Sequence, residues 1–339
     1  MKKRVVTFGE IMMRLSPEGN NRFLQTSAFD INFGGAEANV AILLSHIGID
    51  SRYMSKLPEN AIGDMALAYL NNNKVDTTYV TRGDDRVGVY YLEKGTGVRS
   101  SSVIYDRKDS AISKATISDF ELHKIFEGAD WFHFSGVTPA LGLNLVEILE
   151  QVTSYCNKNN IKISVDLNFR SKLWSYKEFK DAMINLIRDS YLCIGWIDLF
   201  RNDDEFVPVS FTTQEEEYEY FSTRLSKMSE ELNIKYIATT IRETISTSKN
   251  TLRGFIFDGN KFAHSKKYEF EIIDRVGSGD AFAAGLISEL VKEQPIQDSI
   301  EFAVCAGVYK HTISGDACIA NYDEIKSVSN GMISGGVSR

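Results

Sequence analysis

Asp274-Arg-Val-Gly-Ser-Gly-Asp-Ala-Phe-Ala-Ala-Gly285 is a glycine-rich turn that runs into an apolar, alanine-rich segment. Gly277, Ser278 and Gly279 are small enough for the backbone to approach a ligand closely, and glycine accepts backbone angles that other residues resist. Their N–H groups, with those of the first helical turn, would point at an anion at the positive end of the helix dipole. The stretch therefore predicts an anion-binding turn at the start of a helix.

Asp280 stands at the mouth of this turn, where a bound phosphate would repel its carboxylate. Two interpretations fit. In the first, Asp280 only caps the helix, since Asp is common at helix starts. In the second, it accepts the proton of a hydroxyl group that attacks a phosphate, which makes the turn a phosphoryl-transfer site. The twelve residues alone leave both interpretations open.

Composition narrows the class of protein. The chain has 339 residues, of which 43% are hydrophobic and 25% charged, as in an ordinary globular protein. The net charge is -8 with the basic residues scattered, which argues against a nucleic-acid partner. An apolar run at the N-terminus breaks at Gly9 and Glu10, and no run approaches the roughly 20 residues of a membrane span. The four cysteines are Cys156, Cys193, Cys305 and Cys318. Their spacing is not that of a metal site, so we expect them to be reduced and the protein to be cytoplasmic.

Short apolar runs alternate with longer amphipathic ones along the chain. The short runs lack polar alternation, which indicates strands buried on both faces: Val5–Phe8, Trp131–Ser135, Ile161–Leu167, Leu192–Leu199 and Tyr236–Ile241. The longer segments have helical spacing: Ala38–Ile47, Asp64–Asn72, Leu141–Asn157, Tyr176–Arg188 and Gln214–Glu231. This alternation predicts an α/β fold, with a largely parallel sheet covered by helices on both sides and ligands beyond the carboxyl ends of the strands.

Two strand-like runs, Val87–Leu92 and Ser101–Asp106, break this rhythm and suggest an antiparallel hairpin outside the main sheet. With the segment Met12–Phe33 the hairpin would form a small lid over the active edge of the sheet. An ordinary surface hairpin explains the same pattern equally well. The predicted organisation is a single domain over residues 1–339 with a discontinuous β lid from about 12–33 and 86–108.

A second glycine-rich turn, Gly34-Gly35-Ala-Glu-Ala-Asn39, opens another helix, so two helix N-termini would face one crevice. Together with Gly63-Asp64 and the opening stretch, it resembles the two signatures of the ribokinase-like, phosphofructokinase-B type carbohydrate kinases. Within that superfamily, three stretches are similar to the 2-keto-3-deoxygluconate kinases: Gly9-Glu-Ile-Met-Met-Arg-Leu-Ser-Pro17, Asp166-Leu-Asn-Phe-Arg170 and Gly315-Asp316. The resemblance implies a three-layer α/β/α fold with a mostly parallel central sheet and a small β-sheet lid.

The resemblance also implies roles for individual residues. Asp280 falls at the position of the catalytic base, and Gly277, Ser278 and Gly279 at the anion hole that stabilises the transferring group. Asn202-Asp-Asp-Glu205 looks like an N-x-x-E element in which Asn202 and Glu205 help to hold Mg²⁺ through its water shell, although alone this cluster would be read as a solvated loop. The implied ATP contacts are Asn202, Thr240, Arg242, Gly277, Ser278 and Gly279.

The substrate class depends on arginines. Relatives that use neutral sugars usually carry an Asp near the end of the first strand region, whereas Met12-Met-Arg-Leu15 has no acid here. Arg107 and Arg170 match positions that contact a sugar acid, and a guanidinium can hold a carboxylate in a bidentate pair. The other implied sugar contacts are Gly34, Gly35, Tyr90, Tyr105, Asp280 and Asp316. For the two tyrosines alone, packing in a hairpin is the simpler explanation.

Three features depart from the family pattern. Arg275 stands where Thr or Ser is usual, and Glu37 where many members have Pro. Thr239-Thr-Ile-Arg-Glu-Thr-Ile-Ser246 occupies the place of a nucleotide-binding loop but contains no glycine. The anion hole and the base are intact, so we still expect an active enzyme.

The sequence thus predicts an ATP- and Mg²⁺-dependent kinase of the terminal hydroxyl of 2-keto-3-deoxygluconate, a homo-oligomer through its lid with no nucleic-acid or membrane partner. A kinase of a neutral sugar such as fructose or ribose is the alternative within this class. A catalytically silent sugar-binding regulator is the alternative outside it. The sequence does not distinguish the gluconate-derived from the galactonate-derived sugar acid.

Overall fold

The computed structural model describes residues 2–84, 86–200, 209, 211 and 213–331. In this part of the chain, ten strands form one sheet in the order β13-β12-β11-β10-β9-β8-β1-β4-β5, with β14 also paired to β12. All neighbours from β11 to β5 are parallel, while β12, β13 and β14 pair antiparallel. The strands are β1 (Arg4–Phe8), β4 (Asp50–Leu57), β5 (Val80–Arg82), β8 (Trp131–Ser135), β9 (Lys162–Asp166), β10 (Leu192–Ile194), β11 (Tyr236–Thr244), β12 (Lys249–Phe257), β13 (Phe262–His264) and β14 (Tyr268–Glu271).

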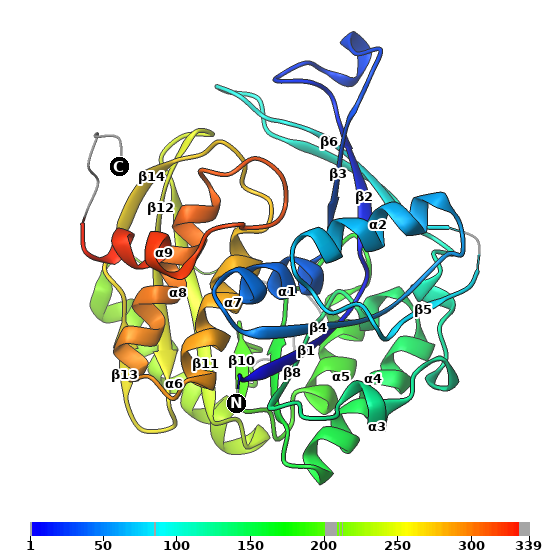
Figure 1. The fold of residues 1–339 in the computed structure, drawn as a ribbon. Helices are drawn as coiled ribbons and strands as arrows, with labels where there is room; N and C mark the ends of the chain where they lie inside the picture. Colours follow the sequence, from blue (N-terminus) through cyan, green and yellow to red (C-terminus); the bar gives the residue numbers. More distant parts are fainter. Residues whose placement is uncertain (1, 85, 201–208, 210, 212, 332–339) are drawn as a thin grey trace.

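Helices cover both faces of this sheet (Figure 1). On one face lie α1 (Ala36–His46), α2 (Ala61–Asn72), α7 (Ser278–Val291), α8 (Ile296–Lys310) and α9 (Tyr322–Ser329). On the other lie α3 (Leu122–Ile125), α4 (Leu143–Lys158), α5 (Tyr176–Leu186) and α6 (Gln214–Leu232). The first hydrophobic core lies between the sheet and α1, α7, α8 and α9, and the second lies between the sheet and α3 to α6. In β1, Val5 packs in the first core and Val6 in the second, so both faces of the strand are buried. This is why the strands read as continuous apolar runs, and the predicted α/β fold is confirmed.

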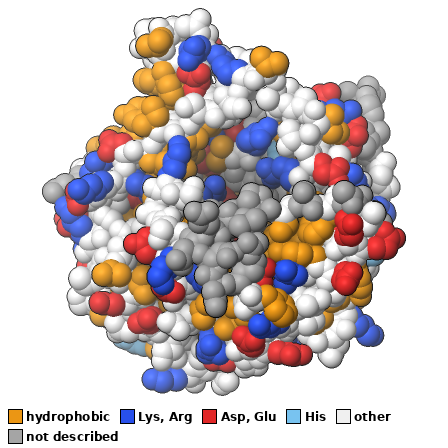
Figure 2. All heavy atoms as spheres, turned by 180° about the vertical axis from the view of Figure 1, so that it is seen from behind, with side chains coloured by type: hydrophobic (Ala, Val, Ile, Leu, Met, Phe, Trp, Pro, Cys, Tyr) orange, Lys and Arg blue, Asp and Glu red, His pale blue; other side chains and the backbone are white. Residues whose placement is uncertain are grey.

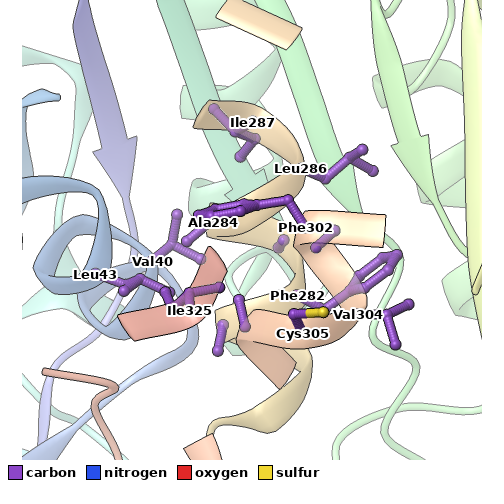
Figure 3. Close-up of a cluster of buried hydrophobic side chains, with 14 of the residues drawn as sticks. Val40, Leu43, Phe282, Ala284, Leu286, Ile287, Phe302, Val304, Cys305 and Ile325 are labelled. Atoms are coloured by element: carbon purple, nitrogen blue, oxygen red, sulfur yellow. The ribbon is translucent and has the colours of Figure 1, made fainter. Parts of the chain in front are cut away.

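The helix that follows the anion-binding turn is held in the middle of the first core. Every residue of α7 from Ala281 to Val291 is buried. Its side chains pack with those of α1, α8 and α9 (Figure 3). A Cβ atom on Gly285 would lie 3.0 Å from the Cα atom of Ala303 in α8, so the two helices approach closely because the residue is glycine. The first turn of α7 is therefore fixed against the sheet by the whole helix behind it.

The segments predicted to form a lid make a second, four-stranded sheet in the order β3-β2-β6-β7, called the lid from here on. It consists of β2 (Met12–Ser16), β3 (Asp30–Gly34), β6 (Val89–Glu93) and β7 (Ser102–Asp106). The predicted antiparallel hairpin is confirmed as the pair β6 and β7, and β2 joins it in parallel through β6. This sheet projects from the main body at the top of Figure 1, beyond the carboxyl end of β1.

Two predicted strands were wrong in extent. The strand predicted at Leu192–Leu199 ends at Ile194, because Gly195 has a φ of 93° that extended backbone does not allow. The strand predicted at Tyr236–Ile241 continues to Thr244, because it pairs along its length with β12. The predicted helices lie within a few residues of α1, α2, α4, α5 and α6. None of the helices in the described ranges is both long and apolar enough to cross a membrane.

Candidate active site

The turn Asp274–Gly277 delivers the chain to the N-terminus of α7. Gly277 caps the helix with a φ of 81°, in the left-handed region, and a Cβ atom there would lie 1.8 Å from the carbonyl oxygen of Asp316. Only glycine fits such a position. The first intrahelical bond runs from the amide of Ala281 to the Gly277 carbonyl (2.9 Å). The three preceding amides, of Ser278, Gly279 and Asp280, therefore have no partner within the helix and can bind an anion.

Two arginines lie at this turn, Arg275 within it and Arg242 beside Ser278. The Nη2 atom of Arg242, on β11, donates to Oγ of Ser278 (2.7 Å), and Nη2 of Arg275 donates to the carbonyl of Thr247 (2.9 Å). Arg242 thus lies where sequence analysis expected a phosphate contact. No hydrogen bond joins Thr240 to the turn among the described residues. The expectation of a loop at Thr239–Ser246 is wrong, because the chain up to Thr244 belongs to β11 and pairs with β12.

The side chain of Asp280 does not cap α7. It is the third residue of the helix, no side chain caps the helix, and its Oδ2 atom accepts a hydrogen bond from Nδ2 of Asn39 (2.7 Å). Asn39 lies in the first turns of α1, so the two glycine-rich helix N-termini meet at this carboxylate. Burial raises the pKa of Asp280 to about 6, opposed by the Asn39 hydrogen bond and the charge of Arg170. Such a group is a carboxylate at neutral pH and can accept a proton.

The second glycine turn is shaped by close backbone contacts. A Cβ atom on Gly34, the last residue of β3, would lie 2.2 Å from Oδ2 of Asp316. A Cβ atom on Gly35, the N-cap of α1, would lie 1.9 Å from the carbonyl oxygen of Glu10. Both glycines are therefore required for α1 and the lid strand to approach the residues beneath them.

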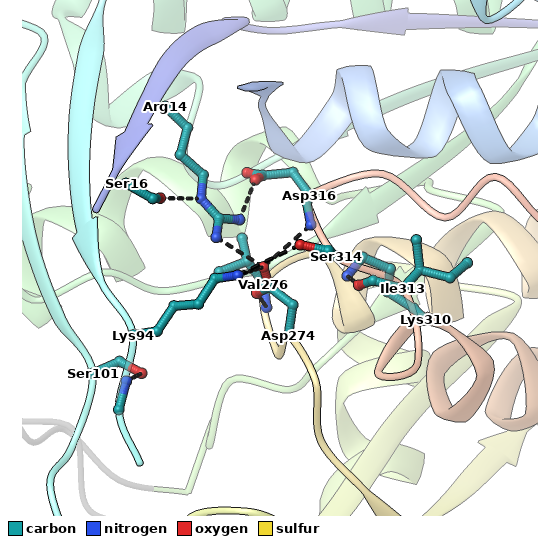
Figure 4. Close-up of polar contacts among 12 residues, drawn as sticks. Arg14, Ser16, Lys94, Ser101, Asp274, Val276, Lys310, Ile313, Ser314 and Asp316 are labelled. Atoms are coloured by element: carbon teal, nitrogen blue, oxygen red, sulfur yellow. Dashed lines mark hydrogen bonds and ion pairs between the residues drawn. The ribbon is translucent and has the colours of Figure 1, made fainter. Parts of the chain in front are cut away.

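A buried cluster of charges joins the lid to the anion-binding turn (Figure 4). Arg14 on β2 is 1% exposed and donates from Nη1 to Asp316 and from Nη2 to Asp274, both at 2.8 Å. Tyr90 on β6 also bonds Asp316 through its hydroxyl group. Both oxygens of the Asp316 carboxylate thus have protein partners, although sequence analysis expected this residue to contact the sugar.

The two candidate arginines differ in their surroundings. Arg107 donates from Nε to Oε2 of Glu10 (2.7 Å); the Glu10 side chain is buried and that of Arg107 is 9% exposed. Arg170 is exposed, and no side-chain hydrogen bond of its guanidinium is found within the described residues. Its charge acts on Asp280 and on Asp166 at the end of β9. Within the described residues Arg170 therefore differs from Arg107 in that no carboxylate forms an ion pair with it.

The two predicted tyrosines lie together on the lid. The rings of Tyr90 and Tyr105 are cross-strand neighbours with centroids 5.9 Å apart, and the Arg107 guanidinium stands 5.8 Å from the centroid of Tyr105. Tyr90 is buried and Tyr105 is 40% exposed. Arg14 is the register partner of Tyr90, and Tyr90 is the register partner of Tyr105, so the three side chains lie on the same face of the lid. Figure 2 shows the surface hollowed beneath the lid, with Lys and Arg side chains around the hollow.

Sequence analysis missed four residues of this crevice: Glu10, Arg14, Asn39 and Asp166. All four stand inside quoted motifs, and Asn39 and Asp166 do so where a helix begins and a strand ends. Burial, and then the charge of Asp280, raise the pKa of Asp166 to about 7, opposed by Arg170. Asp166 ends a buried parallel strand, and ligands bind beyond the carboxyl ends of such strands, so its position in the sequence could have marked it as a site residue. The proposed magnesium ligands Asn202 and Glu205 lie outside the described residues.

Comparison with known proteins identifies the class. The pfkB family of carbohydrate kinases matches residues 2–317, so the chain belongs to this family and is a carbohydrate kinase. A 2-dehydro-3-deoxygluconokinase structure from Thermotoga maritima is 39% identical, with a TM-score of 0.90 over 97% of this chain and 100% of that one. The predicted family and enzyme class are confirmed.

Relatives known by sequence carry two substrate names. A 2-dehydro-3-deoxygalactonokinase from Haloferax volcanii is 28% identical over 98% of both chains. A 2-dehydro-3-deoxygluconokinase from Bacillus subtilis is 27% identical over 93% of this chain and 92% of its own. A ribokinase II from E. coli, solved with ATP and Mg²⁺, shares the fold with a TM-score of 0.80 at 18% identity, over 98% of this chain and 100% of its own.

We predict that Asp280→Asn lowers kcat by about 10²-fold or more, because an amide cannot accept the proton of the attacking hydroxyl. The shape of the side chain is kept, so nucleotide affinity measured by calorimetry stays near that of the wild type. Asp181→Asn, an exposed change on α5, serves as the control. Turnover of Asp280→Asn close to that of the wild type would remove Asp280 from the role of base.

A second prediction concerns pH. Because the base must be a carboxylate, kcat/KM is expected to fall as pH drops through about 6, the pKa of Asp280. Asn39→Ala removes a hydrogen bond that lowers this pKa, so its acidic limb should move to higher pH. The measurement is kcat/KM between about pH 5 and 8, with the exposed Asn71→Ala as control. An unmoved limb in Asn39→Ala would contradict the assignment of that limb to Asp280.

Proposed function

We propose that this kinase transfers the γ-phosphoryl group of ATP to the terminal hydroxyl of 2-keto-3-deoxygluconate, also called 2-dehydro-3-deoxygluconate. The observation that carries the proposal is the guanidinium of Arg170, which has no side-chain hydrogen bond or ion pair within the described residues and whose charge acts on the Asp280 carboxylate. An acid sugar would place its carboxylate at this cation and its far hydroxyl at the base. The names of the Thermotoga maritima and Bacillus subtilis relatives support the same substrate.

Arg170 favours a sugar acid on physical grounds. A guanidinium forms charge-assisted, bidentate hydrogen bonds with a carboxylate, which are stronger than those it forms with hydroxyl groups. A neutral sugar offers this cation no carboxylate, which leaves it without an ion pair among the described residues, although its charge acts on Asp280 and Asp166. Arg107 is already paired with Glu10, so it would bind the sugar carboxylate only by sharing its guanidinium between the two carboxylates or by leaving Glu10. Arg170 is therefore the main determinant of substrate class in this proposal.

The proposed reaction uses residues from both helix N-termini. The terminal hydroxyl oxygen attacks the γ-phosphorus, its proton passes to the Asp280 carboxylate, and ADP leaves. The amides of Gly277, Ser278 and Gly279 stabilise the charge of the transferring group, and Arg242 adds positive charge at Ser278. Asn39 keeps the Asp280 carboxylate oriented while it takes up the proton. The lid would exclude water that competes with the sugar as acceptor.

ATP and Mg²⁺ are proposed as co-substrate and cofactor. The free amides at the start of α7 and the adjacent Arg242 are suited to phosphate oxygens, and a protein of the same fold was solved with ATP and Mg²⁺. Asn202 and Glu205 would hold the metal through water, since Mg²⁺ keeps several waters and prefers oxygen ligands. The metal would neutralise charge on the phosphates. We also propose a cytoplasmic enzyme, since all four cysteines are free and buried, with no nucleic-acid or membrane partner.

The test of this function is a panel of acceptors assayed by ADP release. We expect kcat/KM for ketodeoxygluconate or its galactonate-derived epimer to exceed that for fructose and ribose by about 10²-fold or more. The epimer is included because the Haloferax volcanii relative carries that name. Faster turnover of fructose or ribose would support the neutral-sugar alternative. The absence of turnover with every acceptor would support a silent regulator.

A matched substitution tests the proposed role of Arg170. Arg170→Gln should raise KM for the sugar acid by about 10-fold or more while kcat falls less, because the lost pair holds the substrate in both ground and transition states. The assay should be run near pH 8, where Asp280 is ionised in both proteins. Arg188→Gln, an exposed change after α5, is the control. Unchanged kinetics in Arg170→Gln would point to a neutral substrate.

We further propose that the enzyme is a homo-oligomer through the lid. Ile31, Leu15, Tyr91 and Ile104 are register partners across the four strands, so they form one apolar row on the face opposite Arg14 and Tyr90. Ile31 is 52% and Ile104 54% exposed. A sheet with one apolar face left open is a surface that a second copy of the same sheet would cover.

For this surface, Ile104→Glu should shift the protein from oligomer to monomer, because a carboxylate buried in the interface without a partner is strongly unfavourable. Sedimentation velocity measures the change. Val98→Glu, at a fully exposed hairpin tip off the apolar row, is the matched control. An Ile104→Glu protein that sediments as the wild type does would exclude this face as the interface.

A further inference from the structure

Lys310 is the last residue of α8 and is completely buried. Its Nζ atom donates to the carbonyl of Ile313 (3.0 Å), and no carboxylate of the described residues lies within 4.0 Å of it. Figure 4 shows its side chain beside the turn Ile313–Asp316. The reaction derived above makes no use of this ammonium group. Burying an ammonium without a direct ion pair is unfavourable, so its position calls for a physical reason.

The turn that Lys310 contacts is attached to the anion-binding turn. The carbonyl of His311 accepts from the amides of Ile273 (2.8 Å) and Asp274 (3.3 Å), and the amide of Gly315 donates to Asp274 (3.2 Å). The carbonyl of Asp316 lies against Gly277, where a Cβ atom would come within 1.8 Å. Lys310 therefore fixes one end of a short segment whose other end touches the anion hole.

The charges around Lys310 are those of the active site. Burial lowers the pKa of Lys310, the negative charges of Asp274 and Asp316 oppose this, and the charge of Arg14 acts in the same direction as burial. Asp280 in turn responds to Asn39, Arg170, Asp316 and Lys310, and it acts on Asp166. The Lys310 charge favours the ionised form of Asp280. It also lies at the C-terminus of α8, where the helix dipole favours a cation.

We propose that Lys310 is a positioning residue for phosphoryl transfer, a fixed internal cation that holds the turn 313–316 against the anion hole and provides positive potential to Asp280 and the transferring phosphoryl group. The proposal rests on the role proposed for Asp280. It does not depend on which sugar is the acceptor. A neutral side chain of the same length would fill the space without these two effects.

The test is Lys310→Met, assayed with whichever acceptor the wild-type enzyme phosphorylates fastest, so that an error in the substrate assignment leaves the test intact. We expect kcat to fall about tenfold or more, with KM for the acceptor changed by less than about threefold. The acidic limb of kcat/KM should move to higher pH, a change that a merely structural lysine would not cause. Lys158→Met, at the exposed last residue of α4, neutralises a lysine at a helix C-terminus away from Asp280 and should behave as the wild type does.

Lys310→Met with at least about half the wild-type kcat, or with an unmoved acidic limb, would overturn the proposal. If this variant does not fold, Lys310→Ala is measured with and without ammonium chloride. Recovery of both Tm and kcat on adding ammonium supports an internal cation, whereas recovery of Tm without kcat contradicts a part in phosphoryl transfer. Failure of the proposed base would appear separately, as an active Asp280→Asn enzyme.

Discussion

The buried guanidinium of Arg14 bonds two carboxylates, Asp274 and Asp316, that lie at the two turns framing the anion hole. Removing three charges from water is costly, and such a cluster persists only when each charge has well-placed partners, as here. Loss of one partner from a buried pair typically costs about 3–5 kcal/mol, because the remaining charge stays buried and unpaired. Arg14 belongs to lid strand β2, so the orientation of the lid and the shape of the anion hole depend on the same side chain. Asp316 extends this link to Tyr90 in the next lid strand.

The rest of the site depends on two helices whose N-termini meet. The alanines of α7 and its Gly285 allow close packing against α8, which places Asp280 at the carboxyl end of the sheet. The N-terminus of α1 approaches the same place because Gly34 and Gly35 have no side chains, and it brings Asn39 to the Asp280 carboxylate. Burial in this crevice keeps the pKa of Asp280 raised to about 6, which leaves it a base at neutral pH and gives it more proton affinity than an exposed carboxylate.

How far the sequence predicted this structure can be read from particular elements. Strand β8 was found because all five of its residues are buried, and its pattern is apolar except for His133 and Ser135. Strand β4 was missed because Ser51, Arg52 and Ser55 interrupt its apolar pattern, although each is buried, with Ser55 bonded to the carbonyl of Gly9 and Arg52 paired with Asp76. Glycine turns and helix starts were predicted because their signals are local. The partners of Arg14 were not, because they lie 260 and 302 residues away in sequence and only the fold brings them together. Lys310 was missed because its bond to the carbonyl of Ile313 leaves no pattern in the sequence and its burial follows only from the fold.

The central claim is that Asp280 takes the proton of the terminal hydroxyl of a sugar acid whose carboxylate is held by Arg170. A crystal structure of the enzyme with ketodeoxygluconate and an unreactive ATP analogue measures this directly. The account predicts the terminal oxygen within about 3 Å of an Asp280 carboxylate oxygen, the sugar carboxylate on the Arg170 guanidinium, and the γ-phosphate analogue at the amides of Gly277–Gly279. A sugar bound in the reverse direction, or with its carboxylate away from Arg170, would contradict it.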